Sequence, residues 1–146
     1  MRSAEPGPWL TGNRSEMPTS KSFEDVLVWQ KAHACVLAIY GYTAKMPKHE
    51  LFGLTAQLRR AAVSVPANFA EGFKRHTRPE KLRFYNIAQA SLEECRYYLR
   101  LTQDLDYGNT VMLRESLEEI SQMLESYADK VRQAESRSSG GPSSSY

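Results

Sequence analysis

Cations gather in one short polar stretch between two apolar helical patterns. The stretch Phe73–Arg78 contains Lys74, Arg75 and Arg78 together with a titratable histidine. Ammonium and guanidinium groups bind phosphate oxygens, and a neighbouring aromatic ring can stack on a base. The chemistry predicted here is phosphate binding. Two further arginines precede the stretch, so the candidate nucleic-acid-binding residues are Arg59, Arg60, Lys74, Arg75 and Arg78.

A second polar set recurs every three or four residues and therefore shares one face of a predicted helix. Its members are Gln57, Arg60, Ser64, Asn68 and Glu71. A solvated face would alternate Lys and Glu, so this mixture predicts a specific packing partner. Arg60 and Glu71 stand three turns apart, about 16 Å, and each should pair outside this helix, with Glu93 or Glu94 the nearest candidates. We expect a buried pair whose truncation would cost about 3–5 kcal/mol.

Catalytic and metal-binding patterns find little support. His33, His49 and His76 show no i, i+4 pairing and no Glu-x-x-His spacing, which removes the common zinc and di-iron patterns. No Gly-rich phosphate loop occurs. Cys35 and Cys95 lie in helical patterns without a second cysteine nearby, and we expect both to be reduced and buried. The sequence thus predicts a protein that is not an enzyme and holds no cofactor and no metal.

Charge is unevenly distributed although the net charge is only +2. Between residues 57 and 100, nine basic residues stand against four acidic ones; between 101 and 135, three stand against eight. Such segregation favours either a basic face for nucleic acid or two halves that neutralise each other. The sequence leaves both interpretations open.

The ends of the chain differ in composition from its middle. Residues 1–21 are rich in Pro, Gly, Ser and Thr, and residues 136–146 are rich in Ser and Gly. We expect a disordered N-terminal arm and a disordered C-terminal tail, with translation starting at Met1 or Met17. The sequence shows no signal-peptide pattern and no apolar run of membrane-spanning length. A cytoplasmic protein without membrane contact is therefore expected.

Residues 22–135 predict four helices. The first begins with a capping box at Ser22 and ends before Pro47. The second runs from about Pro47 to a terminal Gly72, with a core face at Leu51, Leu54, Leu58, Val65 and Phe69 and a kink at Pro66. The third runs from the capping residue Thr77 to about Leu105, and the fourth carries an apolar stripe from Leu113 to Val131. Short connections make neighbours antiparallel, which predicts an all-α, up-down-up-down four-helix bundle.

The third predicted helix has more apolar surface than a bundle core requires. One stripe contains Tyr85, Ala88, Leu92, Cys95 and Leu99, and a second, rotated stripe contains Phe84, Ile87, Tyr98, Leu101 and Leu105. In a monomer the second stripe would form an exposed apolar patch. We interpret it as a subunit interface; the alternative is a central helix shielded by long side chains.

Several segments together are similar to a known family. They are Phe23–Ala32, Ile39, Tyr40, Pro47, Glu50–Leu54, Gln57–Gly72, Arg83–Ala88, Ser91–Glu94 and Leu105–Tyr107. The chain resembles the four-helix-bundle family of 23S ribosomal RNA intervening-sequence proteins, which includes the accessory variability determinants of diversity-generating retroelements. Ala90 replaces a usual glycine and Arg96 a common acidic residue.

The resemblance implies a homopentamer, a ring of bundles around a central channel. It also implies that some members bind nucleic acid and that the retroelement members bind a reverse transcriptase. We therefore expect a non-enzymatic, ring-forming accessory protein whose partners are copies of itself, RNA or DNA, and a reverse transcriptase. The alternative is a structural scaffold or protein-interaction module with no nucleic-acid role.

Overall fold

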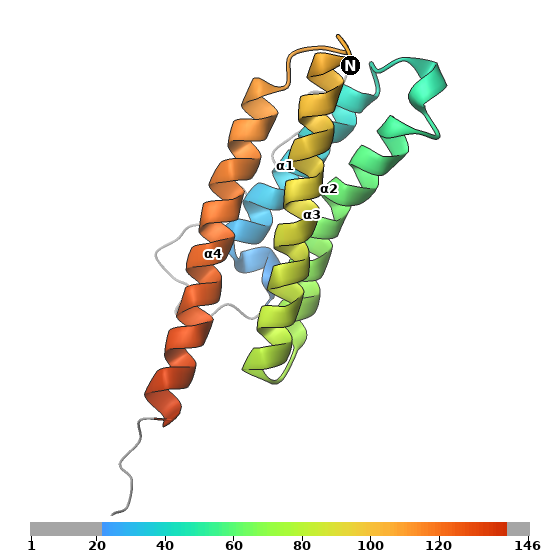
Figure 1. The fold of residues 1–146 in the computed structure, drawn as a ribbon. Helices are drawn as coiled ribbons and strands as arrows, with labels where there is room; N and C mark the ends of the chain where they lie inside the picture. The colour runs from blue at the N-terminus through green and yellow to red at the C-terminus, as the bar shows by residue number, and fades with distance from the viewer. Residues whose placement is uncertain (1–21, 140–146) are drawn as a thin grey trace, which may run out of the picture.

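Four antiparallel helices form the protein in a computed structural model that describes residues 22–139 (Figure 1). They are α1 (Leu27–Thr43), α2 (Leu54–Lys74), α3 (Arg78–Asp104) and α4 (Val111–Ser139), joined in up-down-up-down order. No strand occurs within these residues, so the predicted all-α bundle is confirmed. The expected N-terminal arm of residues 1–21 lies outside the described residues, as do residues 140–146 of the expected C-terminal tail. Residues 136–139, which were expected to belong to that disordered tail, form the end of α4.

The predicted capping box at Ser22 is present, but it begins a different element. The Ser22 hydroxyl accepts a hydrogen bond from the Glu24 amide at 3.2 Å, and the Asp25 carboxylate accepts one from the Ser22 amide at 3.3 Å. The turn that follows is the 3-10 helix η3, Phe23–Asp25. The chain is then extended at the buried Val26, and α1 starts one residue later. Burying this β-branched side chain outweighs continuing the helix.

Helix α2 starts later than predicted. Pro47 precedes a second 3-10 helix, η4 (Lys48–Glu50), and the conformation of Gly53 (φ −108°, ψ −112°) interrupts helical geometry before Leu54. Leu51 consequently lies on the surface, and its assignment to the core face was wrong. Helix α2 runs through Pro66 as one element and ends at Lys74, so Gly72 lies inside the helix and is not its cap.

The core follows the predicted stripes of α3 and α4. The first stripe of α3 is fully buried, as are Leu117, Ile120 and Leu124 of α4. Leu58, Val65 and Phe69 of α2 complete the packing, together with α1 side chains such as Ile39. Cys35 and Cys95 are free thiols inside this core, as predicted.

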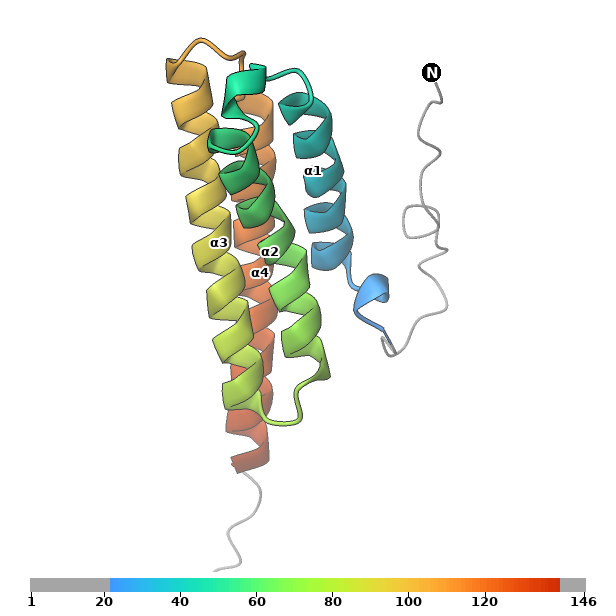
Figure 2. The ribbon, with the colours of Figure 1, turned by 90° about the vertical axis from the view of Figure 1, so that its right-hand side faces the viewer.

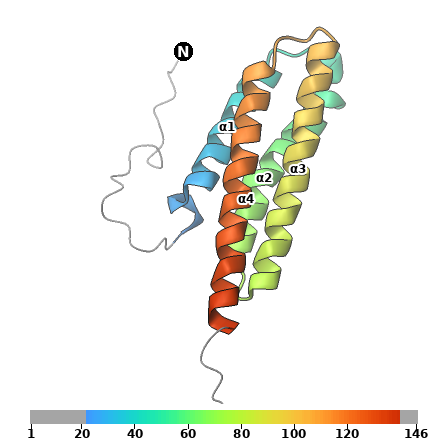
Figure 3. The same ribbon diagram turned by 60° about the vertical axis from the view of Figure 1, so that its left-hand side comes forward.

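Helix α1 covers only part of the bundle. It has 17 residues, whereas α3 has 27 and α4 has 29. Figure 2 shows α1 alongside the half of α2 that follows their connection, and Figure 3 shows α4 continuing well past the start of α1. The end of the bundle that carries the α2–α3 turn is therefore built from three helices.

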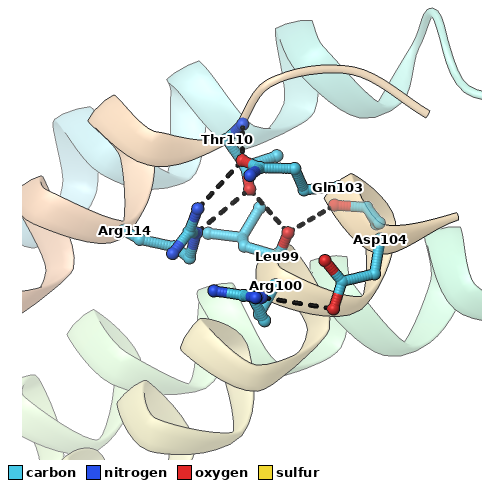
Figure 4. A network of polar contacts seen from close by, with 7 residues as sticks. Leu99, Arg100, Gln103, Asp104, Thr110 and Arg114 are labelled. Atoms are coloured by element: carbon cyan, nitrogen blue, oxygen red, sulfur yellow. Dashed lines mark hydrogen bonds and ion pairs between the residues drawn. The ribbon is translucent and has the colours of Figure 1, made fainter. Parts of the chain in front are cut away.

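A polar network joins α3 to α4 at the opposite end (Figure 4). The buried Thr110 donates its hydroxyl to the Leu99 carbonyl, and its amide donates to Gln103 Oε1 at 3.1 Å. Arg114 donates to the same Gln103 oxygen at 2.9 Å. These bonds hold the α3–α4 connection in one geometry. No helix among the described residues has the length and apolarity needed to cross a membrane.

Candidate nucleic-acid interface

The predicted basic turn is an exposed connection at the three-helix end of the molecule (Figure 1). Lys74 ends α2, Arg75 follows as its cap residue, and the Thr77 hydroxyl caps α3 by accepting from the Glu80 amide at 3.3 Å. Lys74, Arg75 and His76 are exposed, and Arg78 is half-buried in the first turn of α3. The tight link between two capped helices holds these cations on one short loop.

An aromatic ring lies within this cationic cluster. The guanidinium carbon of Arg75 is 4.5 Å from the centroid of the Phe84 ring, and that of Arg83 is 5.5 Å from it. Arg75 also binds Glu71 at 2.9 Å, and Arg83 binds Glu80 at 3.6 Å. Phe84, which the sequence suggested for a subunit interface, therefore forms part of the basic surface. Neither its position nor that of Arg83 at this site was predicted.

Lys81 is a further cation that the sequence-based site omitted. Its Nζ donates to the carbonyl of Phe73 at 2.7 Å and to that of Gly72 at 3.3 Å. These are carbonyls at the C-terminal end of α2, where a positive charge is favourable. Partial burial lowers the pKa of Lys81. Only the antiparallel pairing of α2 and α3 brings this ammonium group to the end of α2.

Arg59 and Arg60 do not join the basic turn. Fifteen residues of continuous helix separate Arg59 from Lys74, about 22 Å at 1.5 Å per residue. Arg59 donates to the Thr43 hydroxyl at 2.8 Å, and its guanidinium lies 4.6 Å from the Tyr40 ring centroid. Arg59 thus binds α1, which was not predicted, and the five candidate cations do not form one site.

Arg60 pairs with Glu94 across α2 and α3, as the sequence suggested. The Arg60–Glu94 distance is 2.8 Å, and Arg60 also donates to Gln57. Tyr98 donates its hydroxyl to Glu94 at 2.7 Å. This hydrogen bond, followed by the bond and charge of Arg60, lowers the pKa of Glu94. The side chains are 61% and 37% exposed, so the pair is not buried within the single chain, contrary to the expectation.

The remaining members of the polar stripe also find partners. The hydroxyls of Ser64 and Ser91 lie 2.8 Å apart across α2 and α3, and the Asn68 amide donates to the Ser64 hydroxyl at 2.8 Å. Glu71 was expected to pair outside its helix, but it binds Arg75 one turn further along the chain. Of the five residues of the stripe, Arg60 and Ser64 therefore bind α3, and the other three bind residues of α2 or its cap.

The second apolar stripe of α3 is partly covered within the chain. Ile87 and Leu105 are exposed, whereas Phe84, Tyr98 and Leu101 are half-buried.

The outer surface of α1 is a second apolar candidate for a subunit interface, and it was not predicted from the sequence. Leu37 is 54% exposed and Tyr40 41%, and α1 contains Lys31 and His33 but no carboxylate. That scarcity of charge was a readable signal, because a helix that is apolar on all sides is normally buried.

No group of three or more His, Cys, Asp or Glu side chains within residues 22–134 could hold a metal ion. The polar chemistry of the described surface consists of ion pairs, amide and hydroxyl contacts, and the basic turn. This arrangement can bind anions.

Comparison with known proteins places the chain in a family. The family model described as 23S rRNA-intervening sequence protein matches residues 24–126. This match extends from η3 into the second half of α4. A comparison with curated proteins finds no match. The four-helix architecture and the extent of the family match lead to one conclusion: the chain belongs to the family of 23S rRNA-intervening sequence proteins.

Proposed function

We propose that this protein is a non-enzymatic, ring-forming accessory protein that binds RNA or DNA through its three-helix end. The observation that carries the proposal is the contact of two guanidiniums, those of Arg75 and Arg83, with the Phe84 ring, with the exposed Lys74 next to Arg75 in the chain. Cations bind backbone phosphates, and guanidinium planes, like aromatic rings, offer stacking surfaces to unpaired bases. This combination supports single-stranded nucleic acid as the ligand.

Ring formation would multiply the basic sites. Each phosphate that a cation neutralises releases counterions, so equivalent turns on several subunits reinforce one another. The proposed ring is a homopentamer, a number taken from the family resemblance alone. The apolar outer surface of α1 supports self-association, because Leu37 would otherwise remain in water. A reverse transcriptase is a proposed further partner if the protein serves a diversity-generating retroelement.

Binding to single-stranded RNA, measured by fluorescence anisotropy across a series of salt concentrations, tests the proposal. We expect affinity to fall steeply with salt and to depend weakly on sequence. The triple variant Lys74→Glu, Arg75→Glu and Arg78→Glu should lose most of the affinity. If each residue makes one phosphate contact, the slope of log K against log salt should fall by about 2.

A matched control separates the site from total charge. Lys31→Glu, Lys45→Glu and Lys48→Glu change the net charge equally but alter exposed residues away from the basic turn. This control should retain RNA affinity much better than the turn variant. Equal losses in the two triple variants would show that binding depends on net charge alone. Unchanged affinity in the turn variant would remove the turn from the mechanism.

The second candidate function is a protein scaffold with no nucleic-acid role. The nearly uncharged outer surface of α1 favours it, since that surface suits a protein partner better than a phosphate backbone. A stable oligomer that shows no salt-dependent binding to any RNA or DNA would support the scaffold. Salt-dependent binding that the turn variant abolishes would reject it.

A further inference from the structure

A groove next to the basic turn is lined by both positively charged and apolar side chains. It lies between the first turns of α3 and the second half of α4, is open to solvent, and has a volume of about 270 Å³. Its lining residues are Arg78, Lys81, Tyr127, Lys130, Val131 and Ala134. Three of these six side chains are cations, and none of the described lining residues carries a carboxylate.

The cations approach the groove from two helices. The Lys81 ammonium already donates two hydrogen bonds to the end of α2, and because it has three N–H donors one remains for a ligand. Arg78 stands in the first turn of the 27-residue α3, where the helix dipole favours an anion. Lys130 comes from the acidic half of the chain, but its neighbours Glu125 and Asp129 bind Arg132 at 3.2 and 2.7 Å.

The apolar part of the lining offers a surface for a flat or apolar group. Tyr127 is half-buried, and its ring contacts Phe69 and Tyr85 with centroids 5.1 and 5.6 Å away. This packing holds Tyr127 in place, and Val131 lines the groove with it. A base or ribose could pack against these side chains while its phosphate meets the cations of the lining.

The charge of the ligand can be inferred from the charge of the groove. An internal phosphodiester carries one negative charge, whereas a phosphomonoester carries about 1.5 to 2 near neutral pH. Three cations therefore suit a terminal phosphate better than an internal one. We propose that this groove binds a nucleotide bearing a terminal phosphomonoester at the end of an RNA strand. The part of this inference that concerns an RNA strand rests on the RNA binding proposed above.

Three short RNA oligonucleotides of the same sequence test the inference. The first carries a 5′-phosphate, the second a 3′-phosphate, and the third has hydroxyls at both ends. We expect one phosphorylated form to bind about tenfold more tightly than the hydroxyl form, as for a hydrogen-bonded charged group. Comparing the two phosphorylated forms identifies the end. Adenosine 5′-monophosphate, measured against adenosine, shows whether a free mononucleotide suffices.

Two variants with matched controls locate the effect. Lys130→Ala removes a cation that lines the groove, and Ala134→Glu adds a carboxylate at an exposed lining position; both should abolish the preference for phosphate. Lys31→Ala likewise removes a cation, and Ser116→Glu likewise adds a carboxylate, at exposed positions that do not line the groove, and both should keep the preference. Circular dichroism verifies that all four variants fold.

The outcomes distinguish this inference from the proposed function. RNA binding with no preference among the three forms, and no preference for the monophosphate over adenosine, would overturn the groove while leaving the basic turn in place. Selective monophosphate binding that Lys130→Ala abolishes, without RNA binding, would support the groove and reject the proposed function. A preference that survives both groove variants would also overturn the assignment.

Discussion

Gly72 of α2 lies directly against the ring of Tyr85 on α3. A Cβ atom at position 72 would stand 2.6 Å from Cε1 of Tyr85 and 3.0 Å from Cβ of Phe84. Tyr85 cannot easily move, because it is 2% exposed and its ring stacks on Phe69 at a centroid distance of 5.2 Å. The absence of a side chain at position 72 thus allows the close approach of α2 and α3 next to the basic turn.

Gly72→Ala should therefore destabilise the protein. Alanine gains about 1 kcal/mol of helix propensity, but overpacking of a fixed core costs about 1–3 kcal/mol. We therefore expect a net loss of up to about 2 kcal/mol in the free energy of unfolding, measured by urea denaturation. Gly41→Ala is the control, since no atom lies within 4 Å of its added Cβ. That variant should be neutral or stabilised, and equal effects at the two glycines would contradict the packing argument.

Glu94 should titrate below the usual range for glutamate. Its pKa is lowered mainly by the Tyr98 hydroxyl and then by Arg60. The contacts of the ionised Glu94 carboxylate contribute fully to stability above the pKa of glutamate in the unfolded chain, about 4.3. This contribution is lost as pH falls through the lower pKa of Glu94 in the folded protein. Tyr98→Phe and Arg60→Ala should each raise the pKa of Glu94, as measured by NMR of the carboxyl carbon. A pKa that neither substitution changes would show that these contacts do not form in solution.

Arg60→Ala should have a small effect on stability. Exposed ion pairs contribute about 0–1 kcal/mol, and the Arg60 side chain is 61% exposed. We expect urea denaturation to give a loss below about 1 kcal/mol. A loss of 3 kcal/mol or more would mean that another subunit buries the pair in the assembled protein.

Both thiols should be unreactive in the folded protein. Burial raises the pKa of Cys35 to about 11 and raises that of Cys95 as well. Because the thiolate is the reactive form, neither should react with a chromogenic disulfide reagent at pH 8 until urea unfolds the chain. Rapid reaction of one thiol under native conditions would indicate local opening of α1 from the core.

Leu37→Glu should dissociate the proposed oligomer. Leu37 is 54% exposed on α1, so a charge there costs little in the single chain but would be costly in an interface. Light scattering should show a smaller particle, and circular dichroism should show unchanged helicity. Lys31→Glu on the same helix is the control for added negative charge. An oligomer that survives Leu37→Glu but not Leu101→Glu would place the interface on α3.

Local patterns predicted most of the fold. The stripes of α3 and α4 repeat over many turns, and Thr77 caps α3 where the sequence indicated. The start of α2 was predicted less well, because Pro47 is a plausible first-turn residue on local grounds. Only the conformation of Gly53 and the 3-10 turn before it move the start to Leu54.

The sequence by itself determined the helical periodicity, the antiparallel order and the cations of the α2–α3 turn, because these depend on neighbours within a few residues. Packing decided which distant side chains meet. Three associations depend on how the helices lie against one another: that of Phe84 with Arg75, that of Lys81 with the end of α2, and that of Lys130 with Arg78. Such contacts follow from core shape, including the missing side chain at Gly72, and no local spacing rule encodes them.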